Sequence, residues 1–254
     1  MTQNRVLENE AFEIIDGDFK HGFLLIADHA SNSIPIEYKG LGLDDEQLKR
    51  HIAYDIGVKQ FTLRLAKKLN VPAVMGKFSR LLIDPNRGMK DPTLVMRVSD
   101  GKIVDGNRDI TEEGKLARIE RFYKPYDAAI SHAINQFDVY NVKPTLLAIH
   151  SFTPYWRGHK RATEVGLLWN EEQAFTTRIV DALRDTTNYV VHDNQPYRGG
   201  MPGDTMDRHG LDKGLEHSLL ELRQDYMGTE AGIDEWVDIF AGILPQIVKN
   251  YKKQ

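Results

Sequence analysis

The fold is decided by Phe23-Leu24-Leu25-Ile26-Ala27-Asp28-His29, an apolar run that ends in an acid and a histidine. The run is too short for a typical helix and leads into the turn-forming residues 31–35, so it predicts a buried strand. In open α/β sheets, ligands bind just beyond the carboxyl ends of the strands. His29 is therefore a candidate metal ligand or acid–base group.

The same pattern recurs at a second position in the chain. An apolar strand predicted over residues 145–149 ends at His150. A single histidine at the end of a strand is more often structural than catalytic. Two histidines at corresponding strand ends favour a shared site.

Apolar runs and helical patterns alternate along the remaining chain. They predict strands at 12–15, 71–75, 81–84, 165–169, 189–192 and 217–222, and helices from about 47, at 58–69, 111–137, 171–185 and 233–250. Such alternation predicts a single α/β domain over residues 1–254 with a mixed, largely parallel sheet.

Three further segments carry local expectations. Residues 88–110, rich in Asp, Gly, Pro and charge, are expected to form a long surface excursion. Residues 153–164 are expected to form a polar, arginine-rich loop. Pro125 is expected to kink or break the helix at 111–137.

Composition limits the function classes. The chain has 254 residues, 41% hydrophobic and 28% charged, as in a folded globular protein, and its net charge of -4 gives no reason to expect nucleic-acid binding. Without a long apolar run or an apolar leader, we expect a cytoplasmic protein with no membrane partner. Because cysteine is absent, a metal site must use His, Asp or Glu, which suits a catalytic zinc better than a structural one.

Two carboxylates stand out because their neighbours are apolar. Asp55 precedes the amphipathic pattern at 58–69 and is the best third metal ligand, with a helix N-cap as the alternative. Glu221 interrupts an apolar strand, where an unpaired charge is costly. It is a candidate general base beside a metal-activated water, unless it forms a salt bridge with Arg223 or another arginine.

Several cationic residues are candidate substrate contacts. Arg80, Arg87 and Arg198 lie in turn contexts, and arginine suits a bidentate grip on a carboxylate, although exposed arginines are common. His217 is either an outer-sphere hydrogen-bond donor or a packed core histidine. The basic residues between 157 and 161 are interpreted as a solvated loop.

Six short motifs, in a fixed order over residues 24–227, carry a resemblance to a known family. They are Asp28-His29-Ala30-Ser31 with Ile34-Pro35, Ala53-Tyr54-Asp55-Ile56-Gly57, Ser79-Arg80-Leu81-Leu82-Ile83-Asp84-Pro85-Asn86-Arg87, Ala148-Ile149-His150-Ser151, Tyr197-Arg198-Gly199-Gly200 and His217-Ser218-Leu219-Leu220-Glu221-Leu222-Arg223-Gln224-Asp225-Tyr226-Met227. The chain resembles the N-formylglutamate amidohydrolases, which are related to the zinc carboxypeptidases and aspartoacylases.

The resemblance implies a three-layer, carboxypeptidase-like α/β fold that holds one zinc ion, or another divalent metal. It implies His29, Asp55 and His150 as ligands and Glu221 as the catalytic glutamate. Related carboxypeptidases carry an HxxE motif, but here Asn32 stands in place of the glutamate. The carboxylate ligand is therefore assigned to Asp55. The substrate-binding candidates are Arg80, Asn86, Arg87, Arg198 and His217.

The expected activity is hydrolysis of the amide bond of a small N-acyl amino acid such as N-formylglutamate. One alternative is a zinc peptidase or amidase that cleaves a peptide or cell-wall amide, with residues 88–110 shaping a wider cleft. The other is a non-catalytic, ligand-binding member of the fold. Assembly into a homo-oligomer is left open.

Overall fold

A central sheet of eight strands organises the computed structural model, which describes residues 6–171 and 173–251. The strands are β1 (Val6–Glu8), β2 (Phe12–Ile15), β3 (Phe23–Ala27), β4 (Ala73–Gly76), β7 (Thr145–Phe152), β10 (Val165–Leu168), β11 (Val191–Asp193) and β12 (His217–Arg223). Their order is β1-β2-β4-β3-β7-β12-β10-β11, with four parallel and three antiparallel pairs. The predicted mixed, largely parallel sheet is confirmed.

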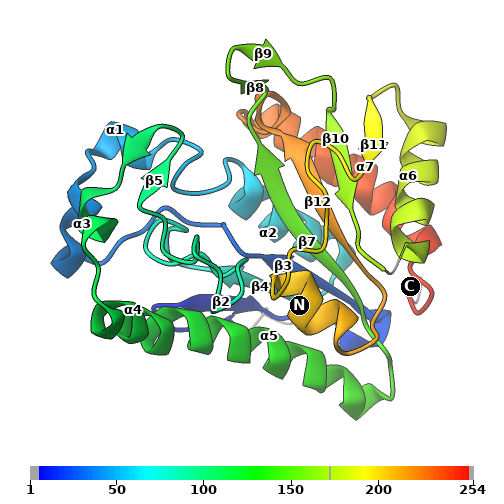
Figure 1. The fold of residues 1–254 in the computed structure, drawn as a ribbon. Helices are drawn as coiled ribbons and strands as arrows, with labels where there is room; N and C mark the ends of the chain where they lie inside the picture. The colour runs from blue at the N-terminus through cyan, green and yellow to red at the C-terminus, as the bar shows by residue number, and fades with distance from the viewer. Residues whose placement is uncertain (1–5, 172, 252–254) are drawn as a thin grey trace.

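Helices cover both faces of this sheet (Figure 1). They are α1 (Asp45–Leu48), α2 (Val58–Leu69), α3 (Asp105–Arg108), α4 (Glu112–Arg118), α5 (Lys124–Gln136), α6 (Ala174–Thr186) and α7 (Glu230–Ile247). α2, α6 and α7 pack on one face, and α5 packs on the other. The three-layer α/β prediction is therefore confirmed.

Strand β3 shows how the sequence produces the three layers. Side chains alternate between the faces of a strand, so a strand that is covered on both sides must be apolar throughout. Phe23 and Leu25 join the core beneath α2 and α7, whereas Leu24 and Ile26 join the core beneath α5. All five residues of β3 are fully buried.

The strand predicted at residues 81–84 is wrong. These residues are buried but lie in turns and pair with no strand of the described chain; side chains and loop backbone groups satisfy their backbone instead. Asn107 donates to the Leu81 carbonyl at 2.8 Å, and Arg118 donates to the Leu82 carbonyl at 2.8 Å. A short buried apolar run cannot be identified as a strand by its periodicity alone.

The three segments with local expectations are more ordered than predicted. Residues 88–110 contain the hairpin β5 (Val98–Ser99) and β6 (Lys102–Ile103) as well as α3, and they bury Leu94. The loop at 153–164 contains the hairpin β8 (Tyr155–Trp156) and β9 (His159–Lys160). A π-helical turn, Ile119–Tyr123, precedes Pro125, so the helical path continues from α4 into α5 without the predicted break.

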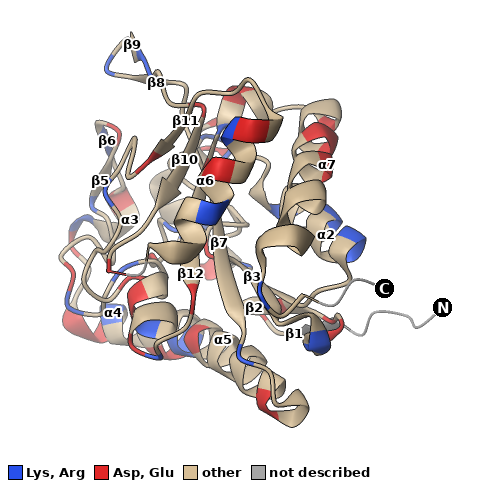
Figure 2. Ribbon diagram, turned by 90° about the vertical axis from the view of Figure 1, so that its right-hand side faces the viewer, with Lys and Arg blue, Asp and Glu red and all other residues tan. Residues whose placement is uncertain are grey.

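Ion pairs join two of the helices on the face that α2 and α7 share. In Figure 2, acidic residues of α7 lie beside basic residues of α2. Arg64 pairs with Glu230 and, at 2.6 Å, with Asp234. Such exposed pairs each contribute little to stability. Within the described part of the chain, no helix is both long and apolar enough to cross a bilayer.

Candidate metal centre and active site

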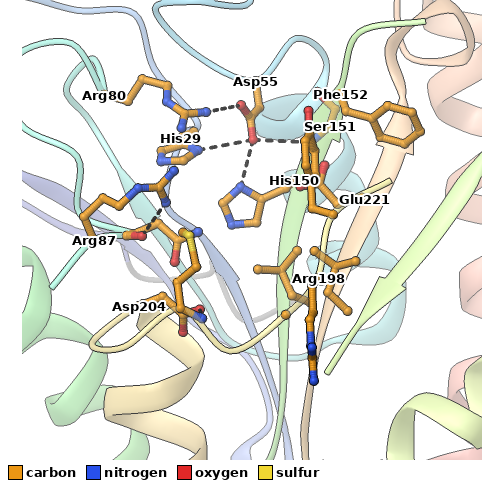
Figure 3. A pocket seen from close by; sticks show the side chains of 16 residues that line it. His29, Asp55, Arg80, Arg87, His150, Ser151, Phe152, Arg198, Asp204 and Glu221 are labelled. Atoms are coloured by element: carbon orange, nitrogen blue, oxygen red, sulfur yellow. Dashed lines mark hydrogen bonds and ion pairs between the residues drawn. The ribbon is translucent and has the colours of Figure 1, made fainter. Parts of the chain in front are cut away.

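The structure brings His29, Asp55 and His150 together (Figure 3). His29 lies just after β3, and His150 lies within the parallel neighbour β7, which runs to Phe152 rather than ending at 149. His29 Nδ1 lies 3.3 Å and His150 Nδ1 lies 2.8 Å from Asp55 Oδ2. One ligand atom from each residue lies within 4.8 Å of the other two, and all three residues are buried.

Asp55 is held in the turn between β3 and α2. Its backbone N–H donates to the His29 carbonyl at 3.0 Å, and its side chain accepts from the Ser151 N–H at 3.3 Å. The N-cap of α2 is Gly57, in the left-handed conformation, and it provides no side-chain cap. The alternative that Asp55 caps this helix is therefore wrong.

Two further acids orient the histidines. Asp84 Oδ1 lies 2.7 Å from His29 Nε2, and Asp28 Oδ2 lies 3.2 Å from His150 Nε2. Hydrogen bonds of this kind fix the ring orientation of metal-binding histidines and leave the other nitrogen toward the metal. Sequence reasoning gave neither acid a role, although each directly follows a buried apolar run.

Asp28 is itself held by hydroxyl groups from distant parts of the chain. Its Oδ1 accepts hydrogen bonds from Tyr126 Oη at 3.0 Å and from Thr205 Oγ1 at 2.8 Å. Nothing in the local sequence around Tyr126 or Thr205 indicates this contact, because it depends on how α5 packs beneath the sheet.

Arg80 lines the site but is paired with two of its acids. Its guanidinium lies 3.4 Å from Asp55 Oδ1 and 3.1 Å from Asp84 Oδ2. These two pairs place a fixed positive charge behind the ligand cluster. These contacts support the site, whereas the sequence predicted that Arg80 binds substrate.

The charges of this cluster balance one another. Burial acts to raise the pKa of Asp28, Asp55 and Asp84, but their histidine partners outweigh it and hold each pKa below its usual value. Burial acts to lower the pKa of His150, but hydrogen bonds to Asp28 and Asp55 raise it to about 10. In the metal-free protein His150 is thus protonated and donates to both carboxylates.

Glu221 differs from these acids because it lacks a hydrogen-bonding partner. It lies on β12 in register with His150, is 8% exposed, and its Oε2 is buried without a hydrogen bond to any described residue. Burial raises its pKa to about 7. Arg223 instead pairs with Glu164 at 3.1 Å and Asp225 at 2.9 Å, so the Glu221–Arg223 salt bridge considered from the sequence is not formed.

A cavity of about 260 Å³ joins these groups. Its lining includes the ligand cluster, Glu221 and four of the predicted substrate contacts: Arg80, Asn86, Arg87 and Arg198. Asn86 is held by the Thr205 N–H at 3.0 Å, and Arg87 donates to the Asn86 carbonyl at 2.8 Å. Arg198 is exposed, and its guanidinium extends away from the histidines in Figure 3.

His217 is the predicted substrate contact that the structure does not bring into this cavity. It is buried at the start of β12, four residues before Glu221, and its Nδ1 donates to the Leu215 carbonyl at 2.8 Å. It lines a separate cavity of about 20 Å³. The packed-histidine alternative fits this position, and a role of His217 in substrate binding stays a prediction.

The cavity also has lining residues that the sequence did not single out, notably Phe152, Tyr197 and Asp204. Burial raises the pKa of Tyr197, and the charge of Glu221 adds to this effect, whereas Arg161 acts in the opposite direction. Asp204 accepts hydrogen bonds from the N–H groups of Met201 at 3.1 Å and Asp207 at 2.8 Å, so it holds the cavity wall in shape.

Comparisons with known proteins show the fold and the family of this chain. A crystal structure of gene product Atu2144 from Agrobacterium tumefaciens is 27% identical, with a TM-score of 0.87 over 94% of this chain and 95% of that one. An N-formylglutamate amidohydrolase from Ralstonia eutropha JMP134 shares the fold at 18% identity, with a TM-score of 0.73 over 92% of this chain and 96% of that one.

A search of curated proteins found no significant match. The sequence signature described as N-formylglutamate amidohydrolase matches residues 21–227, which include the ligand cluster and Glu221. The resemblance noted from the six motifs is confirmed, and the chain belongs to the N-formylglutamate amidohydrolase family.

Proposed function

We propose that this chain is a zinc-dependent amidohydrolase that cleaves the amide bond of a small N-acyl amino acid such as N-formylglutamate. Membership of the family supports amide hydrolysis. The observation that carries the proposal is Glu221: a buried carboxylate without a hydrogen bond to a described residue, in the same cavity as His29, Asp55 and His150.

The ligand cluster fits a catalytic divalent metal. Two imidazole nitrogens and one carboxylate oxygen form the kind of three-residue set that leaves a position open for water. Asp84 and Asp28 already hold the two histidine rings by Nε2, which leaves Nδ1 of each for the metal. His and Asp ligands accept several divalent ions, so zinc is the proposed ion and others are expected to substitute.

The protein residues then have separable roles. Zinc, when bound, supplies Lewis acidity that lowers the pKa of water toward neutrality and polarises the scissile carbonyl. Glu221 accepts a proton from the attacking water while the water oxygen forms a bond to the carbonyl carbon of the substrate. When the C–N bond breaks, Glu221 delivers this proton to the leaving nitrogen. The products are a carboxylic acid and a free amino acid.

The remaining lining residues would hold the substrate. Unlike Arg80, Arg87 and Arg198 form no ion pair with a carboxylate of the described residues, so they are the candidates for binding the substrate carboxylate. Asn86 supports Arg87 and adds polar surface. A cavity of about 260 Å³ suits a small amino-acid derivative better than a long peptide.

The peptidase alternative has less support. Residues 88–110 were expected to shape a wider cleft for a peptide, but no residue of that segment is among those that line the cavity.

Hydrolysis of N-formyl-L-glutamate, N-acetyl-L-glutamate and a dipeptide by the zinc-loaded enzyme tests the proposal. We expect release of free amino acid from the N-formyl compound and loss of this activity after chelation. Full activity after removal of the metal, or preference for the dipeptide, would contradict the proposal.

A further inference from the structure

Arg161 occupies an unusual position beside the cavity. It directly follows the β8–β9 hairpin, which projects beyond the end of β7 in Figure 1. Its guanidinium carbon lies 4.8 Å from the centre of the Tyr197 ring, 5.3 Å from Phe152 and 5.5 Å from Trp156. Stacking on three rings fixes the guanidinium in place. Phe152 and Tyr197 line the cavity, so Arg161 lies one ring away from it.

This guanidinium has no carboxylate to neutralise it. No ion pair joins Arg161 to an acid in the described residues, and its Nη1 is buried there without a hydrogen-bond acceptor. By contrast, Arg80 and Arg223 each lie against two carboxylates. Arg161 also hydrogen-bonds to the Tyr197 side chain, so the unsatisfied part of the guanidinium is Nη1. A buried charged N–H without an acceptor is costly, and an anion bound against Tyr197 and Phe152 would lower the electrostatic part of this cost.

Among the described residues, two walls of the cavity thus carry positive charge that no carboxylate pairs: Arg87 at one, and Arg161 behind Phe152 and Tyr197 at the other. The third unpaired cation, Arg198, is exposed and extends away from the histidines. Arg87 lies on one side of the histidines, and Phe152, which contacts Arg161, lies on the other in Figure 3. A ligand with one carboxylate can neutralise the positive charge at only one of these two walls. A ligand with two carboxylates can satisfy both, because charges in a partly dehydrated cavity are weakly screened.

We propose that Arg161 is a specificity-determining residue that attracts a second anionic group of the substrate, held against Phe152 and Tyr197. This inference rests on the proposed function, because it concerns the substrate of the same cavity. The substrate class is an N-acylated dicarboxylic amino acid, and Arg161 provides the preference over an analogue with a neutral side chain.

The hairpin offers a matched control. Arg157 lies in the turn between β8 and β9, and its guanidinium stacks on Trp156 at 5.7 Å. It is exposed, and no ring that lines the cavity contacts it in the described part of the chain. Arg157→Gln removes one positive charge from the same hairpin without removing charge from the cavity wall.

Calorimetric binding of two isosteric probes tests the inference. N-formyl-L-glutamate and N-formyl-L-glutamine are titrated into zinc-loaded Glu221→Gln enzyme, which retains the cavity, and into the same enzyme with Arg161→Gln, Arg161→Lys or Arg157→Gln. We expect Arg161→Gln to weaken N-formylglutamate binding roughly tenfold or more, as for the loss of a charge attraction across a partly dehydrated cavity wall, while N-formylglutamine binding changes less than about threefold. The affinity of Arg161→Lys for N-formylglutamate should lie between those of the protein with Arg161 intact and of Arg161→Gln. Arg157→Gln should change the affinity for neither probe.

Three outcomes would overturn the inference. Arg161→Gln could weaken the binding of both probes equally, or leave N-formylglutamate binding unchanged. The third outcome is that the protein with Arg161 intact does not bind N-formylglutamate. Melting curves of every variant show whether a loss of binding reflects unfolding. Where Arg161→Gln does not fold, the binding result for Arg161→Lys tests the inference in its place. Turnover by the wild-type enzyme is scored separately. Selective binding without hydrolysis would refute the proposed function and leave the role of Arg161 standing.

Discussion

Among single residues, Glu221 is distinguished because its Oε2 has no hydrogen-bonding partner in the described part of the chain, whereas Asp28, Asp55 and Asp84 each contact a histidine. Glu221→Gln keeps the size of the side chain and removes its ability to accept a proton. We expect kcat to fall by about 10²–10⁴-fold, with unchanged metal content and little change in KM. Stopped assays with N-formylglutamate measure kcat and KM, and metal analysis measures the zinc content.

A suitable control is Glu216→Gln. Glu216 lies one residue before β12 and pairs with Arg178 at 2.8 Å, outside the residues that line the cavity. Its replacement should leave kcat close to that of the wild type. Near wild-type kcat in Glu221→Gln would remove the general base from the proposed mechanism.

The raised pKa of Glu221 predicts the acidic limb of the pH profile. Only the ionised carboxylate accepts a proton, and burial raises its pKa to about 7. A bound divalent cation adds positive charge and lowers this pKa, so kcat/KM of the zinc-loaded enzyme should rise with pH along a limb centred at or below about 7. Residual activity of Glu221→Gln should lack the Glu221 contribution to this limb. A wild-type kcat/KM that falls between pH 5 and pH 7 would contradict the assignment.

At the level of elements, three neighbouring strands deliver the reactive groups. β3 leads into His29, β7 carries His150, and β12 carries Glu221 in register with His150. Because these strands are adjacent and parallel, groups near their carboxyl ends meet at one edge of the sheet. Asp55 reaches the same edge through the turn before α2.

Gly57 makes that turn possible. Its φ is +82°, and an added Cβ would lie 2.5 Å from the Met227 carbonyl oxygen. Gly57→Ala should therefore destabilise the fold by about 1–3 kcal/mol and, because Asp55 is two residues away, weaken metal binding. Chemical denaturation and metal titration measure the two effects.

Gly242→Ala is the matched control for this change. Gly242 lies within α7, and an added Cβ would meet no atom within 4 Å. Alanine is favoured over glycine in a helix by about 0.5–1 kcal/mol, so this variant should be as stable as the wild type or slightly more stable. Equal stability of the two variants would show that the turn tolerates a side chain.

The elements also show which features the sequence could predict and why the other features could not be predicted from it. Apolar runs ending in His29 and His150 are local signals, and the prediction that they share an edge needs only parallel strands. The turns at 81–84 depend on hydrogen bonds from Asn107 and Arg118, which are distant in sequence. Likewise, Tyr126 reaches Asp28 only through the packing of α5, and no periodicity encodes such a contact.

For the whole molecule, the metal site is a concentration of buried charge. The three negative charges of Asp28, Asp55 and Asp84 are offset in part in the metal-free protein by Arg80 and by the protonated His150. A ligand that binds only the folded state adds about 2.7 kcal/mol of stability at 100 times its Kd. Zinc should therefore raise the melting temperature by roughly 5–10 °C for a chain of this size, and chelation should reverse the rise.

This gain should depend on pH, with a sign set by His150. Its folded pKa is about 10, above the unfolded value, so its ionic contacts stabilise the metal-free protein fully below the unfolded pKa and lose this effect as pH rises through 10. Zinc needs the neutral ring, so its binding must displace a proton. The increase in melting temperature caused by zinc should thus grow from pH 6 to pH 8. Melting curves with zinc and with a chelator at each pH measure it, and His150→Ala, which removes both the ligand and its proton, should abolish the increase. A gain that shrinks between pH 6 and pH 8 would show that the metal does not displace the His150 proton.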